Sequence, residues 1–509
     1  MKKRLFKPIK IGGATAIITI ASFLSYGIGL LRDRIIAINF GTTSATDTYN
    51  ASFLVPDILF NLFIAGALSA AFLPVFSDLL VKDKKEAYKL ANTVLTGATV
   101  LIAALAIIAY IFMKQIVPFI FEEATISMQT DIIQMTRLLL FSAILFAISN
   151  TLGNILMSFK HFLSYALSPI LYNLGIIVGV IYFNESLGIY SAAAGVLIGA
   201  LLHCLIRVID TATTDYKYKP SLNLKHPGLK KIIKLMIPRS IGLIAWQINL
   251  LIFAKVGIKL VEGGFAAFNF ARNIQSFAVS LFGISFATAV FPFLSNTVSN
   301  NDREGYTDHI QKTMQRILFF TIPAAVGVMT LSTELIEMIL GGGAFNEKSI
   351  QLTSLLLYFF AFSIPFESLS QILSRAFYAI HNTITPMIVN IISMLIISFC
   401  TIFLAPRFGI EWFSIGFGLG FIVYVTIIII LLKKHLKSFK TKVFIKSLSK
   451  TIIASAVMAI FIISSTFLPH LIRIVLATSI FFITAAILKS SEIGSIKYIL
   501  DRIFKKSNL

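Results

Sequence analysis

The sequence has few charged residues and very few cysteines, and both shortages restrict what the protein is. Of its 509 residues, 13% are charged and 57% are hydrophobic, whereas soluble domains carry about 25% charged and about 45–50% apolar residues. The two cysteines, Cys204 and Cys400, both fall in apolar stretches, which argues against structural disulfides and cysteine-based metal sites. The composition therefore indicates a protein that spans a membrane many times.

The sequence also lacks the short motifs of common enzyme classes. It contains no HExxH zinc motif, no P-loop glycine pattern and no GxSxG nucleophile elbow, so metalloprotease, nucleotide-driven and hydrolase chemistry have no sequence support. We expect no enzymatic activity, no catalytic residues, no cofactor and no bound metal.

Long apolar stretches run through the whole chain. A helix needs roughly 20 apolar residues to cross a hydrocarbon core of about 30 Å, and the stretches are continuous rather than alternating as in a membrane β-barrel. The sequence therefore predicts an all-α integral membrane protein with about 14 transmembrane helices. The predicted spans are approximately 12–39, 49–78, 91–118, 133–157, 162–183, 188–209, 232–257, 264–296, 311–333, 351–378, 383–404, 411–432, 450–468 and 471–488.

The basic residues concentrate in alternate loops. Lysines and arginines are dense at 2–10, 82–89, 207–234 and 433–450, whereas the loops "GTTSATDTY" and "FNESLG" have none. This is the positive-inside pattern, and it predicts that both termini are cytoplasmic. The net charge of +21 then reflects juxtamembrane loops rather than a nucleic-acid-binding surface.

The two halves of the chain share a weak internal repeat. Pro74 and Ser77 recur as Pro292 and Ser295, 218 residues later. Likewise, 217 residues separate Leu152, Ile155, Leu156 and Pro169 from Leu369, Ile372, Leu373 and Pro386. We predict two six-helix lobes in parallel orientation, 1–220 and 221–440, followed by 441–509 with two more helices and a cytoplasmic tail. Transporters with such repeats place the substrate between the lobes and alternate access by rocking.

Charged side chains within the spans are the candidate functional residues, because a charge in lipid costs about 2.5–3.5 kcal/mol on insertion scales. Arg32, Asp33 and Arg34 form a triplet late in the first span, and Arg272 lies two turns into the eighth. Each could simply mark the membrane interface. Alternatively, Arg32 and Arg272 could meet across a central cleft and bind an anion, since the guanidinium fork suits phosphate.

Two acids within the spans have open interpretations. Asp57 follows Pro56. It could hydrogen-bond backbone groups that the proline leaves without a partner, or it could be a functional residue. Glu367 is deep in the tenth span with no obvious basic partner in the sequence. It could be a satisfied structural acid, a protonated one or a functional one.

Several motifs in order resemble one known family. The segments "GIGLLRDRIIAINFGTTSATDTYNASFLVPDILFNLF", "ALSAAFLPVFSD", "LSPILYNLGIIVGV", "FNFARNIQSFAVSLFGISFATAVFPFLSN" and "LSRAFYAIHNTITP" are similar to those of the MurJ (MviN) lipid II flippase family. This family belongs to the multidrug/oligosaccharidyl-lipid/polysaccharide exporter superfamily. The similarity extends from about residue 20 to 390, and the family's fourteen spans fit the predicted number.

The resemblance implies a function and a set of site residues. Members move lipid II, the undecaprenyl-diphosphate-linked peptidoglycan precursor, to the outer leaflet of the bacterial cytoplasmic membrane. It implies lipid II and membrane lipids as partners, together with other cell-wall synthesis proteins, and a groove for the lipid tail at the last two spans. The implied substrate-binding residues, which carry the diphosphate or orient one another, are Arg32, Asp33, Asp47 and Arg272; Arg34 and Asn61 complete our set.

The sequence departs from the family pattern at several cavity positions. Tyr26 replaces an arginine, Phe60 and Asn61 replace an arginine pair, and Ala65 replaces an acid. The predicted cavity is therefore less cationic, which leaves open an exporter of another polyprenyl-diphosphate-linked glycan or of a drug or organic ion, and a non-transporting scaffold. Spans 7 and 11 contain no Asp or Glu, so we expect no sodium site there.

Overall fold

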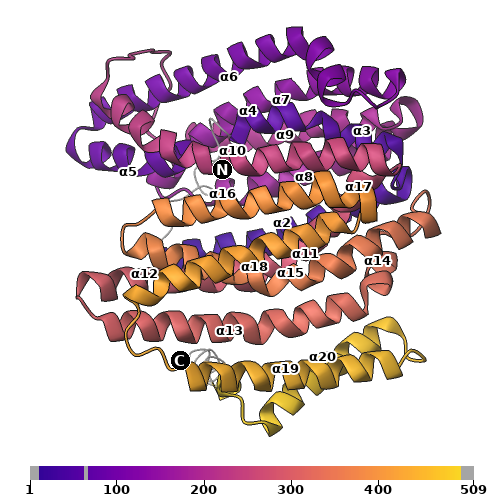
Figure 1. Cartoon of the computed structure of the whole chain (residues 1–509). Helices are drawn as coiled ribbons and strands as arrows, with labels where there is room; N and C mark the ends of the chain where they lie inside the picture. Colours follow the sequence, from indigo (N-terminus) through magenta and orange to yellow (C-terminus); the bar gives the residue numbers. More distant parts are fainter. Residues whose placement is uncertain (1–10, 62–66, 495–509) are drawn as a thin grey trace. The chain divides into compact units, whose positions relative to one another are not determined.

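The computed structural model describes residues 11–61 and 67–494, which form helices and connecting turns with no β-strand in these ranges (Figure 1). Eleven helices or continuous helical runs in the described chain are long and apolar enough to cross a membrane. They coincide, to within a few residues at most ends, with the last twelve predicted spans except 232–257. The all-α membrane fold is confirmed, and the total of fourteen spans stays a prediction.

Contacts divide the chain into two compact units. Unit 1 comprises residues 1–266 and 340–349, and unit 2 comprises 267–339 and 350–509. The helix that covers the predicted span 232–257 belongs to unit 1. The helices of unit 1 are α2 (Ile11–Phe40), α3 (Ser44–Ser52), α4 (Leu54–Phe60), α5 (Ala67–Lys82), α6 (Lys84–Ile120), α7 (Ile126–Ser158), α8 (Leu163–Leu187), α9 (Tyr190–Thr211) and α10 (Pro227–Leu260).

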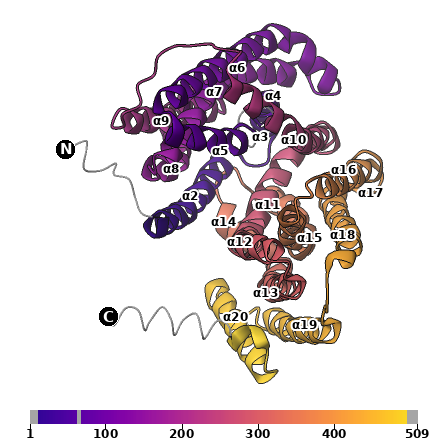
Figure 2. The same cartoon turned by 90° about the vertical axis from the view of Figure 1, so that its left-hand side faces the viewer.

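Unit 2 contains most of the remaining helices, two of which include π-helical turns. The segments are α11 (Gly264–Ala278), η2 (Val279–Ile284), α12 (Ser285–Ser299), α13 (Arg303–Thr330), α14 (Ser332–Leu340), α15 (Glu347–Ala379), α16 (Ile384–Phe399), η3 (Cys400–Leu404), α17 (Ala405–Phe408), α18 (Trp412–Leu432), η4 (Lys433–His435), α19 (Thr441–Ser464) and α20 (His470–Ile487). Both views show α19 and α20 side by side (Figure 2).

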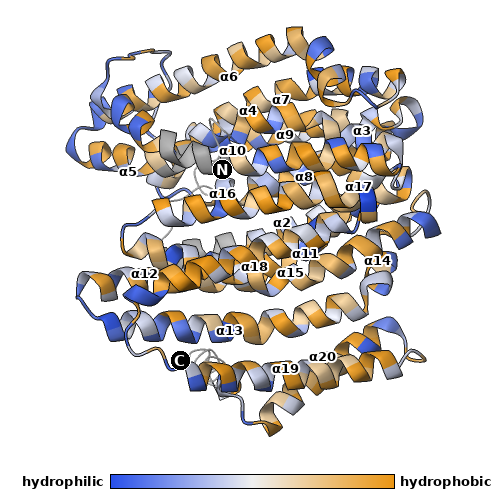
Figure 3. Cartoon of the chain, in the orientation of Figure 1, coloured by the Kyte–Doolittle hydropathy of each residue, from blue (hydrophilic) through white to orange (hydrophobic). Residues whose placement is uncertain are grey.

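The hydropathy of the helices fits a membrane environment. Apolar residues dominate the middle of the long helices, and hydrophilic residues gather at helix ends and in the loops (Figure 3). At 1.5 Å per residue, the 37 residues of α6 extend about 55 Å, well beyond a hydrocarbon core of about 30 Å. The first turns of α6 therefore carry exposed charges such as Lys85.

The predicted second span, 49–78, is broken in the structure. α3 ends at Ser52 and α4 begins at Leu54, with Phe53 between them. Pro56 has no backbone N–H to donate to the carbonyl of Ser52, four residues earlier. The hydroxyl of Thr136 on α7 donates to that carbonyl instead, at 3.2 Å. The proline thus ends the regular hydrogen bonding, and a side chain from another helix compensates for the lost bond.

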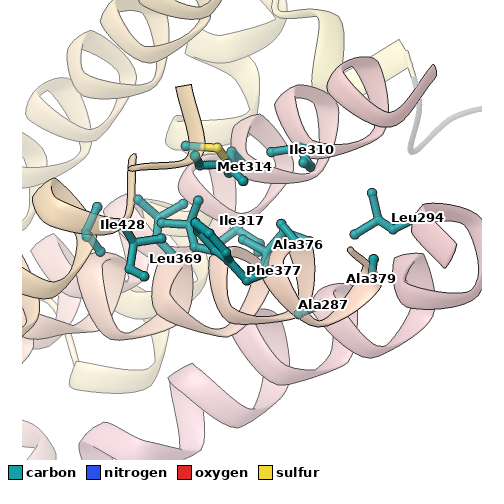
Figure 4. Packing of buried hydrophobic residues seen from close by; sticks show 14 of the residues in the cluster. Ala287, Leu294, Ile310, Met314, Ile317, Leu369, Ala376, Phe377, Ala379 and Ile428 are labelled. Atoms are coloured by element: carbon teal, nitrogen blue, oxygen red, sulfur yellow. The ribbon is translucent and has the colours of Figure 1, made fainter. Parts of the chain in front are cut away.

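A buried hydrophobic cluster of unit 2 draws on α12, α13, α15, α16 and α18. Side chains of α12, α13, α15 and α18 point toward one another in Figure 4. Leu369 and Ile372, which belong to the sequence repeat, are buried in this cluster. Their counterparts in unit 1, Leu152 and Ile155, are buried in the main cluster of that unit. The repeated positions therefore serve as core residues in both units.

Glycines set the close approach of α8 and α9 in unit 1. An ideal Cβ on Gly175 would lie 2.3 Å from Gly199 Cα, and one on Gly179 would lie 2.4 Å from Gly195 Cα. Both helices thus carry two glycines four residues apart, a spacing that lets membrane helices pack backbone to backbone. Any side chain at these positions has to push the two helices apart.

We expect Gly175→Ala to lower the free energy of unfolding by about 1–3 kcal/mol, because an added methyl overpacks this contact. Thermal unfolding of the purified protein in detergent measures the change. Gly97→Ala on α6 is the matched control, since its Cβ would meet Leu222 at an ordinary 3.5 Å. Equal melting temperatures for the two variants would contradict the close packing of α8 and α9.

Candidate substrate-binding site

Arg32, near the end of α2, is held by two partners within unit 1. Its Nη2 and Nε donate to Asp33 Oδ1 at 2.6 and 3.0 Å, and its Nη1 donates to Asn173 Oδ1 on α8 at 2.8 Å. Asp33 is only 6% exposed. A buried carboxylate next to a guanidinium reduces the cost of both charges in an apolar environment. The predicted pair of Arg32 and Asp33 is therefore in direct contact.

Asn173 is a partner of Arg32 that sequence reasoning missed. Its amide Nδ2 donates to the carbonyl of Pro169 one turn earlier, at 3.1 Å, which turns the amide oxygen toward Arg32. The two residues are 141 positions apart, and an asparagine within a predicted span was the only available signal. The amide fixes the guanidinium without adding a charge.

Arg34 lies on a different side of α2 from Arg32. With 3.6 residues per turn, two residues correspond to roughly 200° around the helix. Its side chain is partly exposed. The structure therefore separates Arg34 from the contacts of Arg32, as the helical geometry predicted.

Asp47 caps a helix. Its Oδ2 accepts from the backbone N–H of Gly263 and its Oδ1 from that of Ala266, both at 2.8 Å, at the start of α11. These N–H groups have no partner within the helix, and a carboxylate there also favours the helix dipole. Asp47 is 1% exposed, and burial raises its pKa to about 7 although these backbone N–H groups oppose the rise. Both oxygens of Asp47 are therefore committed to the backbone.

A glycine allows the same junction to form. Gly263 has φ +75, and a Cβ there would lie 2.0 Å from the carbonyl oxygen of Thr42. Thr42 also donates its hydroxyl to Ser349 Oγ at 2.8 Å. The turn after α2 is thus fixed on both sides, and this holds the end of the helix that carries Arg32.

Asn61 lies in a cavity of about 360 Å³ inside unit 1. Phe60, which stands with Asn61 where the family pattern has arginines, also lines it. Asp57 lines the same cavity and makes no side-chain hydrogen bond among the described residues. Of the two interpretations left open for Asp57, the one in which it bonds backbone groups freed by Pro56 has no support among the described residues, and the Thr136 hydroxyl bonds the freed carbonyl of Ser52. The cavity is lined by Phe53, Pro56, Asp57, Phe60, Asn61, Ser142, Ala143, Phe146, Asn150, Tyr172 and His203.

Arg272 on α11 forms the corresponding cluster within unit 2. Its Nη2 donates to Glu367 Oε1 on α15 at 2.8 Å, and its Nη1 donates to Gln275. Gln275 Nε2 in turn donates to Glu367 Oε2 at 2.9 Å, and the guanidinium lies 4.7 Å from the ring centroid of Phe417. Glu367 therefore has a basic partner, 95 residues away in the sequence, which sequence reasoning missed.

Arg207 is a further buried cation that sequence reasoning placed in a basic loop. The structure puts it inside α9 at 2% exposure. It donates to the carbonyl of Ser149 at 2.9 Å, to Asn150 Oδ1 at 3.1 Å and to Ser168 Oγ at 3.0 Å. Three acceptors from α7 and α8 satisfy the guanidinium, so Arg207 ties these helices together.

Unit 2 also contains an apolar groove of about 360 Å³ next to the last two helices. Its lining comes from α11, η2, α13, α14, α19 and α20 and is almost entirely aliphatic and aromatic. Such a lining suits a hydrocarbon chain. The lining residues include Phe282, Phe320, Leu331, Met458, Ile462, Ile474, Phe481 and Phe482.

The sequence of residues 36–488 matches the family model described as "Lipid II flippase MurJ". The chain belongs to the MurJ family. It is 28% identical over 448 residues to the probable lipid II flippase MurJ of Thermotoga maritima, covering 87% of this chain and 89% of that protein. It is 29% identical over 438 residues to the lipid II flippase MurJ of Thermosipho africanus, covering 85% and 87%.

Solved structures give the same family and fold. A structure titled "Lipid II flippase MurJ, inward closed conformation" matches with a TM-score of 0.81 and 26% identity over 93% of this chain and 98% of that chain. An inward-facing multidrug resistance transporter of the MATE family, in the MOP superfamily, has a TM-score of 0.69 and 15% identity over 84% and 99%. The second likeness shows the fold alone. The chain is thus a multi-pass membrane transporter of the MurJ family and not an enzyme.

We expect Asp47→Ala to lower the free energy of unfolding by about 1–2 kcal/mol, because the N–H groups of Gly263 and Ala266 lose their acceptor. Asp47→Asn keeps one acceptor oxygen and should lose less. Chemical or thermal unfolding measures both. Asp78→Ala, which removes an exposed ion pair with Lys82, should change little; a similar loss there would show that Asp47 has no special capping role.

We expect Glu367→Leu to destabilise the MurJ fold by about 3–5 kcal/mol, because it removes a carboxylate from a buried ion pair. The double variant Arg272→Leu, Glu367→Leu should be more stable than the single one, since neither charge is then buried. A double-mutant cycle of melting measurements gives the coupling. Additive losses would contradict a direct interaction between the two side chains.

Proposed function

We propose that this chain is a lipid II flippase, which carries the lipid-linked peptidoglycan precursor from the cytoplasmic to the outer leaflet of the cytoplasmic membrane. The observation that carries the proposal is the family match over residues 36–488. The arginines of α2 and α11 support it, because each lies in an apolar helix and presents a fork suited to phosphate oxygens.

In this proposal Arg32 and Arg272 each bind the diphosphate of lipid II. Each guanidinium already has a carboxylate partner, Asp33 or Glu367. The diphosphate therefore has to compete with these carboxylates. When the diphosphate replaces the carboxylate, the arginine still has an anionic partner throughout transport. The positive charge of the arginine is therefore never left unpaired in the membrane.

The remaining site residues have different roles. Asn173 and Gln275 hold the arginines through hydrogen bonds and act as positioning residues. Asp47 positions the start of α11 through its cap and does not touch the cargo. Asn61 contacts the cargo from the cavity of unit 1, and Arg34 adds positive charge near the end of α2.

The apolar groove next to α19 and α20 binds the polyprenyl tail. Its aliphatic and aromatic lining matches a hydrocarbon chain, and burying each CH₂ contributes about 0.8 kcal/mol. A tail held in a groove open to lipid does not have to enter the polar part of the protein. The headgroup and the tail can then move by separate routes.

Transport follows an alternating-access cycle of two lobes, 1–220 and 221–440, with 441–509 as the tail-binding addition. Both termini are cytoplasmic, as the basic loops indicate. An inside-negative potential favours outward movement of an anion, by about 2.3 kcal/mol per charge per 100 mV. Two charges on the diphosphate gain roughly 4–5 kcal/mol from this field.

A second candidate cargo is another polyprenyl-diphosphate-linked glycan. The observation that favours it is the cavity of unit 1, where Phe60 and Asn61 stand at positions at which the family pattern has arginines. The diphosphate and tail would be recognised in the same way, and only the sugar or peptide would differ. For lipid II, we expect other cell-wall synthesis proteins to act with the chain.

We expect this chain to restore surface-accessible lipid II in bacteria depleted of their own flippase. Arg32→Ala and Arg272→Ala should each abolish the restoration at equal membrane levels, because the diphosphate loses its charged donor. Arg137→Ala is the matched control: this arginine donates to the carbonyl of Tyr110 and stacks on its ring, away from the proposed site. Full activity of both site variants would exclude a role of Arg32 and Arg272 in diphosphate binding. A wild-type protein that inserts into the membrane but is inactive would favour the second candidate cargo.

A further inference from the structure

The cavity of unit 1 is lined by a carboxylate, Asp57, that has no ion-pair partner among the described residues. Asp57 on α4 makes no side-chain hydrogen bond or ion pair within the described part of the chain, and the cavity lining includes no lysine or arginine. Asp57 is partly exposed to the cavity, whereas the buried acids Asp33 and Glu367 each have a basic partner. A carboxylate held away from bulk water is costly unless it is paired, so Asp57 is suited to a positively charged ligand.

Several aromatic side chains line the same cavity. The ring centroids of Phe60 and Phe146 are 5.6 Å apart, and those of Phe146 and Tyr172 are 5.2 Å apart. These rings come from three different helices, so the wall is built by the fold and not by a local sequence motif. The face of an aromatic ring attracts an organic cation, and here three aromatic side chains line one cavity together with one carboxylate.

The polar groups of the cavity fit an ammonium better than a metal ion. Asn150 Oδ1 accepts a hydrogen bond from Arg207 at 3.1 Å, and the Ser142 hydroxyl donates to a backbone carbonyl at 2.7 Å. Among the described lining residues this leaves Asp57, Asn61, Tyr172 and the second ring nitrogen of His203, whose Nδ1 lies 2.8 Å from Ser149 Oγ, with uncommitted polar groups. Hard metal cations need about six or more oxygen ligands, whereas an ammonium needs only a few acceptors and a ring face.

The cavity and the contacts of Arg32 share helix α8. Tyr172, in the cavity wall, is followed directly on α8 by Asn173, which holds Arg32 at 2.8 Å. One helix therefore supports a cation-binding wall and an anion-binding arginine. This arrangement is complementary to a cargo that carries both a phosphate and an amine.

We propose that this cavity binds an ammonium group, with Asp57 as its counter-ion and Phe60, Phe146 and Tyr172 as its aromatic wall. One source of the ammonium is the free amino group of the cargo peptide, and for this source the proposal rests on the proposed flippase function. A free organic cation is the other source with the same chemistry. Asp57 then contributes to cargo selection, and Arg32 to diphosphate binding.

The test compares two cargoes that differ only at the amine. Purified full-length protein is given undecaprenyl-diphosphate-linked muropeptide with a lysine in its peptide, or the same molecule with that lysine acetylated. We expect the wild type to bind the free amine roughly tenfold more tightly, which corresponds to about one charged contact. Asp57→Asn should erase this preference, and Glu185→Gln, an exposed acid at the end of α8, should keep it.

Two further arms make the test decisive. Asn61→Arg places a guanidinium beside Asp57 and should also remove the preference, whereas Asn61→Gln should retain most of it. Tetramethylammonium serves as the free cation, and its binding to the wild type but not to Asp57→Asn would support the cavity as an ammonium site. Melting temperatures check folding, which Asp57→Asn should preserve because the Asp57 side chain makes no hydrogen bond among the described residues.

The outcomes separate this inference from the flippase function. If the wild type transports both cargoes but shows no amine preference and binds no tetramethylammonium, the ammonium site is wrong and the flippase function stands. If the wild type transports neither cargo but binds tetramethylammonium through Asp57, the ammonium site stands and the flippase function is wrong. An unchanged preference in a folded Asp57→Asn protein would overturn the inference.

Discussion

The cost of placing charges in apolar helices constrains this structure most. Arg32 and Arg272 are both compensated within their own units, by Asp33 with Asn173 and by Glu367 with Gln275. Arg207 is satisfied by three neutral acceptors instead. The folded chain therefore stabilises its cations before any cargo arrives, and helix packing within each unit depends on these contacts. An anionic cargo can use the arginines only by replacing partners that are already present.

This constraint links the parts of the proposed mechanism. The arginine clusters, the apolar groove beside α19 and α20 and the aromatic cavity around Asp57 are suited to a phosphate, a hydrocarbon tail and an amine. A polyprenyl-diphosphate-linked muropeptide with a free amine carries all three groups. Asp47 contributes differently, since its cap on α11 fixes the turn that follows the helix of Arg32. Asp47 can thus affect transport indirectly, by fixing the position of this backbone segment.

Sequence reasoning predicted the features that follow from composition and periodicity. Eleven spans were predicted, because hydropathy is a local property, and the resemblance to the family implied that Arg32 and Asp33 orient one another. The pairing of Glu367 with Arg272, the role of Asn173 and the burial of Arg207 depend on contacts between helices far apart in the sequence, which one sequence does not specify. The break at Phe53 was missed because Pro56 can either kink a helix or end it, and only the hydroxyl of Thr136 decides the outcome.

The central claim is that the cargo diphosphate replaces a carboxylate partner of an arginine, and direct binding tests it. The affinity of a polyprenyl diphosphate for the purified protein would be measured in the wild type and in Glu367→Gln, with folding checked by melting temperature. The account predicts tighter binding by the folded variant, because a neutral amide competes less well for Arg272 than a carboxylate does. Unchanged or weaker binding by a folded Glu367→Gln protein would contradict it.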